Sequence, residues 1–162
     1  MWIEVDITAD IRVRAETRAK AMGAINHSIL KGKGNITGFI GEEVVAHLLG
    51  IPPSDTFDYD FVKNGVKFDV KTKWRNVPPQ PHYTCSVEQR QIHIHKQDCH
   101  AYIFVSTDKS YTKAWVIGVL SKQEFLKLAD TVPEGTFDPA NQWSCSRDCF
   151  SVRMDEVRPL HF

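Results

Sequence analysis

Charged and apolar side chains alternate in two short segments near the middle of the chain. Residues 57–62 read Phe-Asp-Tyr-Asp-Phe-Val, and residues 66–74 read Val-Lys-Phe-Asp-Val-Lys-Thr-Lys-Trp. A period of two predicts β-strands, because successive side chains of a strand point to opposite faces. Asn64 and Gly65 lie between the segments, and this pair is a strong signal for a two-residue hairpin turn. We therefore predict an antiparallel hairpin whose charged side chains share one face.

The register of this hairpin predicts a cluster of carboxylates. With that turn, Asp60 lies opposite Asp69, and Asp58 lies opposite Lys71. Carboxylates directly opposite each other repel, so a cation is expected between them. Oxygen ligands on rigid strands suit Mg²⁺, and Lys71 would hold an ammonium group over the same site, where it can orient an attacking water. The pattern predicts metal-assisted hydrolysis, and a solvated strand face is the simpler alternative.

The other face of the hairpin is predicted to be apolar and to pack against helices, since it would carry Phe57, Tyr59, Phe61, Phe68 and Val70.

A helix is predicted directly before the hairpin, at residues 37–49, because apolar side chains recur there at helical spacing and Gly50 follows. Glu42 lies at the edge of the apolar stripe of this helix, and Glu43 projects about 100° away from Glu42. The helix therefore presents at least one acidic side chain near its packed face.

These residues resemble the motifs of the PD-(D/E)xK nuclease superfamily, a group of metal-dependent phosphodiesterases. Asp60 and residues 69–71, Asp-Val-Lys, match its D and D-x-K elements. The sequence Gly-Phe-Ile-Gly-Glu-Glu at residues 38–43 resembles its helix motif, in which the functional Glu directly follows a Gly. That position is Glu42 here. The resemblance covers residues 37–75 in specific motifs and identifies no subfamily.

The resemblance implies a restriction-endonuclease-like αβββαβ core and hydrolysis of DNA phosphodiester bonds. It implies that Glu42, Asp60 and Asp69 are catalytic residues that bind Mg²⁺, with Mn²⁺ able to substitute. Lys71 completes the catalytic set. An endonuclease is favoured, but a junction resolvase or an exonuclease would carry the same site residues. The usual Pro before the motif Asp is replaced by Tyr59.

Asp58 is a second candidate for the motif carboxylate, because Asp-Tyr-Asp offers two acidic positions. We prefer Asp60, since its cross-strand partner is Asp69 and the bulky apolar Phe61 follows it. Asp58 would then support the metal ligands without binding the ion itself.

Four basic residues lie close to the motifs in the sequence and are predicted to bind the phosphate backbone of DNA: Lys31, Lys33, Lys73 and Arg75. The first two belong to residues 26–35, where two glycines between lysines predict a flexible basic loop. Cleavage of both strands of a duplex with one site per chain favours a homodimer or a larger homo-oligomer.

The chain is predicted to form one α/β domain, with a central mixed β-sheet flanked by helices. Its 162 residues suit a single domain. A helix at residues 8–23, with Thr8 as its N-cap, precedes the motif core at about 37–129. Residues 130–162 add a C-terminal extension of strand and loop. The smaller predicted elements are buried strands at 101–106 and 114–119, a helix at 121–129 and an edge strand at 149–154.

The composition excludes several classes of protein. Apolar residues make up 42% of the chain and charged residues 25%, as in ordinary globular proteins. Twenty Lys and Arg balance twenty Asp and Glu, so any binding of nucleic acid must depend on the local arrangement of charge. No apolar run reaches the about 20 residues of a membrane helix, and the N-terminus lacks the features of a signal peptide. We therefore expect a soluble cytoplasmic protein with no membrane partner.

Two other functions stay open. Cys145 and Cys149 lie downstream of His93, His95 and His100 and could hold zinc in a nucleic-acid adaptor. Neither Gly nor Pro lies between the two cysteines to form a turn, so we predict reduced thiols instead. The same fold could also serve as a non-catalytic DNA-binding or interaction module, and the complete set of motif residues argues against this.

Overall fold

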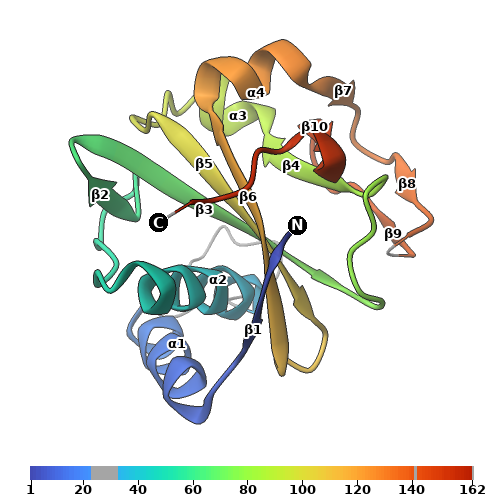
Figure 1. Cartoon of the computed structure of the whole chain (residues 1–162). Helices are drawn as coiled ribbons and strands as arrows, with labels where there is room; N and C mark the ends of the chain where they lie inside the picture. The colour runs from blue at the N-terminus through green and yellow to red at the C-terminus, as the bar shows by residue number, and fades with distance from the viewer. Residues whose placement is uncertain (23–32, 141, 162) are drawn as a thin grey trace.

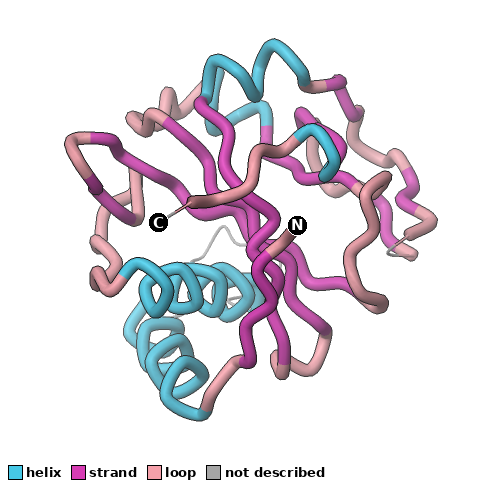
Figure 2. Tube along the Cα trace, viewed as in Figure 1, coloured by secondary structure: helices cyan, strands magenta, loops and turns pink. Residues whose placement is uncertain are grey.

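A five-stranded mixed β-sheet forms the centre of the protein, with the strand order β1-β6-β5-β3-β2 (Figures 1 and 2). The computed structural model describes residues 1–22, 33–140 and 142–161, with side chains at all of these except 33–35. Strands β3 and β5 run parallel, and the other neighbours run antiparallel. The prediction of a central mixed sheet is confirmed. The five strands are β1 (Ile3–Asp6), β2 (Phe61–Lys63), β3 (Val66–Arg75), β5 (Ala101–Asp108) and β6 (Lys113–Ser121).

Two helices, α1 (Ala9–Met22) and α2 (Lys33–Leu49), cover one face of this sheet (Figure 1). Helix α2 packs against β3 and β5, and α1 packs against α2. A hydrophobic core lies between the helices and the sheet, and Ile40, Val70 and Ile103 are among its buried members. The predicted helices therefore flank the sheet as expected for an α/β domain.

Smaller elements cover the other face of the sheet (Figure 1). A second hydrophobic core lies here, in which the rings of Tyr102 and Phe125 meet edge to face at 5.4 Å. The central strand β5 is thus buried on both faces, which explains its continuous apolar sequence. The covering elements are β4 (Thr84–Glu88), β10 (Cys149–Arg153) and β7 (Asp130–Val132) in a second sheet, the ribbon of β8 (Phe137–Asp138) and β9 (Trp143–Ser144), the helices α3 (Gln89–His93) and α4 (Lys122–Leu128), and the 3₁₀ turn η1 (Met154–Glu156).

The ends of the helices follow local sequence signals. Thr8 Oγ1 accepts a hydrogen bond from Ile11 N at 3.3 Å, so Thr8 caps α1 as predicted. The predicted end at Gly23 lies outside the described residues. Helix α2 begins at Lys33, so the predicted loop is wrong for residues 33–35, and the rest of that loop lies outside the described residues. The end of α2 is as predicted, since Gly50 has a φ of 66° and its N–H donates to Ala46 O at 2.9 Å.

The predicted hairpin turn is confirmed. Asn64 and Gly65 have φ angles of 51° and 76°, as a type I′ turn requires. Lys63 pairs with Val66, and Phe61 pairs with Phe68, which is the predicted register.

The first strand of the hairpin is shorter than predicted, because it begins at Phe61 and residues 57–60 are not part of it. The side chain of Thr56 bonds locally, accepting from Tyr59 N at 3.2 Å and donating to Tyr59 O at 2.7 Å. Such local bonds compete with strand pairing. The predicted pairing of Asp58 with Lys71 is therefore wrong, and so is the single apolar face: Phe57 is exposed, and Tyr59 packs into the core on the other side of the sheet.

The elements after the hairpin that the sequence predicts lie at their predicted positions, but the pairing of one of them differs from the prediction. Strands β5 and β6 lie where buried strands are predicted, and Ser121 with Glu124 forms the predicted capping box of α4. Strand β10 also lies at its predicted position, but it is the middle strand of the second sheet and not an edge. The sequence predicts no strand at the positions of β1, β4, β7, β8 and β9.

Gly41 allows α2 to approach β3 very closely. A Cβ atom at Gly41 would lie 1.8 Å from Thr72 Oγ1, which is shorter than any van der Waals contact. The helix and the strand therefore meet here with no side chain from the helix between them. This contact directly precedes Glu42 and brings that residue close to the strand that carries Asp69.

We expect Gly41→Ala to lower the free energy of unfolding by about 1–3 kcal/mol, because the helix must move away from Thr72. Gly38→Ala is the matched control in the same helix, since its added Cβ would meet nothing within 4 Å. It should be neutral or stabilise by up to about 1 kcal/mol, because Ala favours a helix over Gly. Urea unfolding measures both variants, and equal values would contradict the close contact.

Candidate active site

Asp69 lies on β3 with only 5% of its surface exposed. Its Oδ1 accepts a hydrogen bond, whereas its Oδ2 forms an ion pair but has no hydrogen bond among the described residues. Oδ2 lies 2.6 Å from Lys71 Nζ, and Oδ1 accepts a hydrogen bond from Gln97 Nε2 at 2.8 Å. Gln97 is itself buried, and its Nε2 also donates to Phe57 O at 3.1 Å. The carboxylate is therefore held in one orientation by a cation and an amide. Sequence reasoning missed Gln97, which lies in a loop without a motif.

Asp60 reaches the same region from the residue directly before β2. Because β2 pairs with only three residues of β3, the next amide on this edge of β3, that of Val70, is not paired by the strand. Asp60 Oδ2 accepts a hydrogen bond from this amide at 2.7 Å. Burial and the neighbouring charges of Glu42 and Asp69 raise the pKa of Asp60 to about 8.

Glu42, which lies on α2, is the third carboxylate of a cluster that also contains Asp60 and Asp69. Its Oε2 lies 2.5 Å from Arg18 Nη2 of α1. Burial raises the pKa of Glu42, Arg18 opposes that shift, and the charge of Asp69 adds to it. The structure therefore brings together Glu42, Asp60, Asp69 and Lys71, which are the four residues predicted as the site.

Glu43 points to a different environment from Glu42. Its carboxylate lies 2.9 Å from Arg14 Nε and 3.3 Å from Arg18 Nη1, and its side chain is almost fully buried between the two helices. Glu43 thus joins α1 to α2, and Arg18 contacts both acidic residues. The sequence shows Arg14 and Arg18 at helical spacing, but spacing alone does not distinguish a solvated face from a helix contact.

Asp58 lies apart from this cluster. Its Oδ1 accepts a hydrogen bond from Asp98 N at 3.1 Å, which fixes the loop before β5. The structure therefore does not place it behind the three carboxylates.

The residues predicted to bind DNA have different surroundings. Lys31 lies outside the described residues, and of Lys33 only the backbone is described, at the start of α2. Lys73 Nζ lies 3.2 Å from Asp138 Oδ2. Arg75 is 1% exposed and donates from Nη2 to Thr84 O at 2.6 Å, so it lies in the interior and not on an open surface.

The cysteines considered for zinc lie side by side, with Cys145 Sγ 3.5 Å from Cys149 Sγ. Burial raises the pKa of Cys149 to about 12, which keeps it a thiol. Of the histidines, His93 packs edge-on against Phe150, and His100 Nδ1 accepts a hydrogen bond from Lys67 N. Across residues 1–22, 33–140 and 142–161, no three His, Cys, Asp or Glu side chains are positioned to hold a metal ion.

This finding includes the acidic cluster, whose side chains are engaged in ion pairs. Glu42 faces Arg18 and Asp69 faces Lys71, so nitrogen atoms of the chain occupy positions next to these carboxylates. These cations neutralise the cluster in part, while burial and the charges of Glu42 and Asp69 still raise the pKa of Asp60.

Comparison with models of known protein families finds no match, and a search of curated proteins finds none either. The described helices include none that is both long and apolar enough to cross a membrane. The functional interpretation therefore depends on the geometry of the cluster itself.

In EDTA, we expect Asp60→Asn to gain stability relative to the unchanged protein as the pH rises from 5 to 8. A carboxyl group whose pKa is raised by folding stabilises the folded state at low pH, and this contribution is lost between its unfolded pKa near 4 and its folded value of about 8. Asn stays neutral throughout and can still accept from Val70 N. Urea unfolding at both pH values measures the difference.

Asp58→Asn is the control for this experiment, because it removes a carboxylate of the same loop that lies apart from the cluster. Its effect on unfolding should be the same at pH 5 and pH 8. A pH-independent effect of Asp60→Asn would mean that Asp60 is not repelled by Glu42 and Asp69.

Proposed function

We propose that this protein is a metal-dependent nuclease that hydrolyses phosphodiester bonds of DNA, acting as an endonuclease. The observation that carries this proposal is the convergence of three carboxylates and a lysine from α2, the start of β2, and β3. Buried carboxylates with a raised pKa, such as Glu42 and Asp60 here, are typical of functional sites, because such an arrangement costs stability in the absence of a ligand. The proposed catalytic residues are Glu42, Asp60, Asp69 and Lys71.

The donor set fits a hard divalent cation such as Mg²⁺, or Mn²⁺ in its place. Carboxylate oxygens are the preferred ligands of Mg²⁺, and a cation would relieve the repulsion from Glu42 and Asp69 that, after burial, raises the pKa of Asp60. Glu42, Asp60 and Asp69 would hold the ion. When bound, it supplies Lewis-acid activation of a phosphate and a more acidic water.

Lys71 has the position of a group that orients the attacking water and neutralises charge developing on the phosphate. Its ammonium lies 2.6 Å from Asp69 Oδ2, and its side chain is 19% exposed. A cation held by a neighbouring carboxylate needs little reorganisation during the reaction, and this makes its stabilisation of the transition state effective. Gln97 fixes the other oxygen of Asp69 and so keeps the pair aligned.

The order of elements supports the resemblance to the PD-(D/E)xK superfamily. From α2 through β2, β3, β4 and α3 to β5, the chain reads αβββαβ. One element departs from a single-sheet core, because β4 pairs with β10 in the second sheet. The proposal therefore depends more on the clustered side chains than on the topology.

The direct test is cleavage of supercoiled plasmid and linear duplex DNA in Mg²⁺, with EDTA as the negative control. Lys71→Met should reduce the rate by about 100-fold or more, because it removes the positive charge next to the phosphate. Lys67→Met is the matched control, since Lys67 lies on the same strand but pairs with Asp98 outside the cluster. Cleavage by Lys71→Met at the unchanged rate would exclude this site.

The two adjacent glutamates should separate catalysis from stability. Glu42→Gln should abolish cleavage and leave a folded protein, because Arg18 keeps its pair with Glu43. Glu43→Gln should lower the free energy of unfolding by about 1–3 kcal/mol, because it weakens two ion pairs of a buried carboxylate, and should retain cleavage below its melting temperature. Cleavage assays together with thermal unfolding measure both, and greater loss of cleavage from Glu43→Gln would contradict the assignment.

A further inference from the structure

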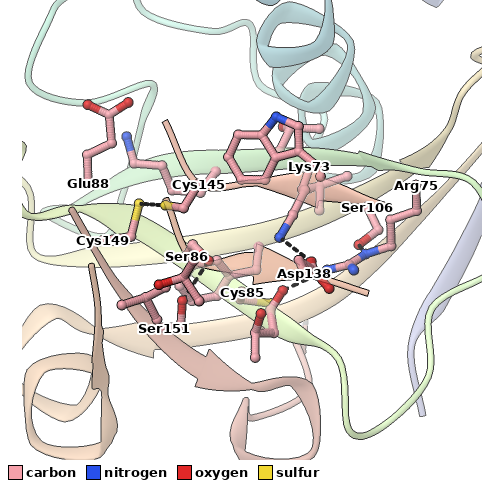
Figure 3. A pocket seen from close by; sticks show the side chains of 18 of the residues that line it. Lys73, Arg75, Cys85, Ser86, Glu88, Ser106, Asp138, Cys145, Cys149 and Ser151 are labelled. Carbon is pink, nitrogen blue, oxygen red and sulfur yellow. Dashed lines mark hydrogen bonds and ion pairs between the residues drawn. The ribbon is translucent and has the colours of Figure 1, made fainter. Parts of the chain in front are cut away.

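A cavity of about 440 Å³ is lined in part by Lys71, which contacts Asp69 of the carboxylate cluster, and Figure 3 shows the cavity around Lys73 and Arg75. Its floor is formed by β3 and β5 of the main sheet, and its walls come from β4, β10 and the β8–β9 ribbon. This volume is within the range of sites that bind small molecules. The cavity therefore lies next to the position proposed for the scissile phosphate.

Two cations line this cavity from the same face of β3 as Lys71. Lys73 and Arg75 follow at intervals of two residues, so their side chains leave the strand on one side. Figure 3 shows both side chains with their nitrogen atoms toward Asp138. Lys73 Nζ contacts that carboxylate at 3.2 Å. Burial lowers the pKa of both Lys73 and Arg75, and the charge of Asp138 opposes this shift.

Arg75 carries an unused hydrogen-bond donor. Its Nε donates to Ser106 Oγ at 3.1 Å and its Nη2 to Thr84 O at 2.6 Å, but buried Nη1 has no hydrogen-bond partner among the described residues. A buried guanidinium donor without a partner is costly, and an anionic oxygen would satisfy it. The floor of the cavity is therefore suited to a phosphate group.

Aromatic side chains lie at the opening of the cavity, on the β8–β9 ribbon. Trp143 is 41% exposed and Phe137 55% exposed, and both line the cavity. Lys73 Nζ lies 5.8 Å from the centre of the Trp143 ring, so the aromatic surface is close to the cationic floor. Bases of single strands stack on such rings, whereas the bases of an intact duplex are not accessible.

We propose that this cavity binds one unpaired nucleotide of a DNA strand, with its phosphate on Lys73 and Arg75 and its base against Trp143 and Phe137. This inference rests on the proposed nuclease function and narrows its substrate to DNA with an unpaired nucleotide next to the cleaved bond. Asp138 lies at the position on Lys73 that the phosphate would take. The incoming phosphate displaces it from Lys73, and the ribbon that carries Asp138 shifts with it.

The test measures oligonucleotide binding by tryptophan fluorescence, in EDTA so that no cleavage occurs. The probes are a 5′-phosphorylated single-stranded tetranucleotide and a blunt 12-base-pair duplex. The tetranucleotide should quench the fluorescence and bind more tightly than the duplex, and Trp143→Phe should remove the quenching. Lys73→Met should weaken binding of the tetranucleotide by about tenfold or more, because a charge-assisted contact is lost.

Asp138→Asn should have the opposite effect and tighten binding by about threefold or more, because the competing carboxylate is neutralised. A misfolded variant would not bind more tightly, so this result cannot arise from loss of structure. Asp130→Asn is the control, since it makes the same change in charge outside the lining of the cavity. Equal affinity for both probes, or unchanged affinity in both Lys73→Met and Asp138→Asn, would overturn the proposal.

The result is independent of the cleavage test. If Lys73→Met loses tetranucleotide binding and Lys71→Met cleaves at the full rate, nucleotide binding in the cavity is supported and the proposed catalytic site is rejected. If cleavage depends on Lys71 but the tetranucleotide does not quench the fluorescence, the nuclease function is supported and nucleotide binding in the cavity is rejected.

Discussion

Repulsion among the carboxylates of Glu42, Asp60 and Asp69 is the constraint to which the rest of the candidate site responds. All three lie where burial limits screening by water, so each needs a specific donor. Asp69 is held by Lys71 and by the amide of Gln97, Glu42 by a guanidinium from another helix, and Asp60 by a backbone amide. These contacts do not remove the repulsion, since the pKa of Asp60 stays raised.

The supporting contacts come from elements that are distant in the sequence. Helix α1 is joined to α2 through Glu43, and the same arginine that makes one of these contacts, Arg18, also reaches Glu42. The lack of a side chain at Gly41 lets α2 lie directly on β3, which shortens the distance between the helix and strand carboxylates. Packing of the helices and compensation of charge thus depend on one another in this part of the molecule.

Strand β3 carries residues of both the carboxylate cluster and the cavity, because its side chains alternate between the two faces of the sheet. Phe68 and Val70 pack with the core under the helices, and Thr72 meets Gly41. The alternate residues from Asp69 to Arg75 face the other side of the sheet, and three of them, Lys71, Lys73 and Arg75, line the cavity there. A single strand with a period of two can therefore hold both a proposed catalytic lysine and a proposed phosphate site at fixed spacing.

The sequence by itself determined the local features of this protein. Asn64-Gly65 sets the turn and register of the hairpin, Thr8 and Ser121 cap their helices, and the apolar run of β5 marks a buried strand, because each depends on neighbours in the chain. Only the tertiary structure decided the rest. Local bonds of Thr56 ended the first strand early and moved Asp58 away, contacts between α1 and α2 gave Arg18 its role, and the second sheet buried Arg75 and enclosed the cavity. These outcomes depend on groups far apart in the sequence, whose proximity no local pattern encodes.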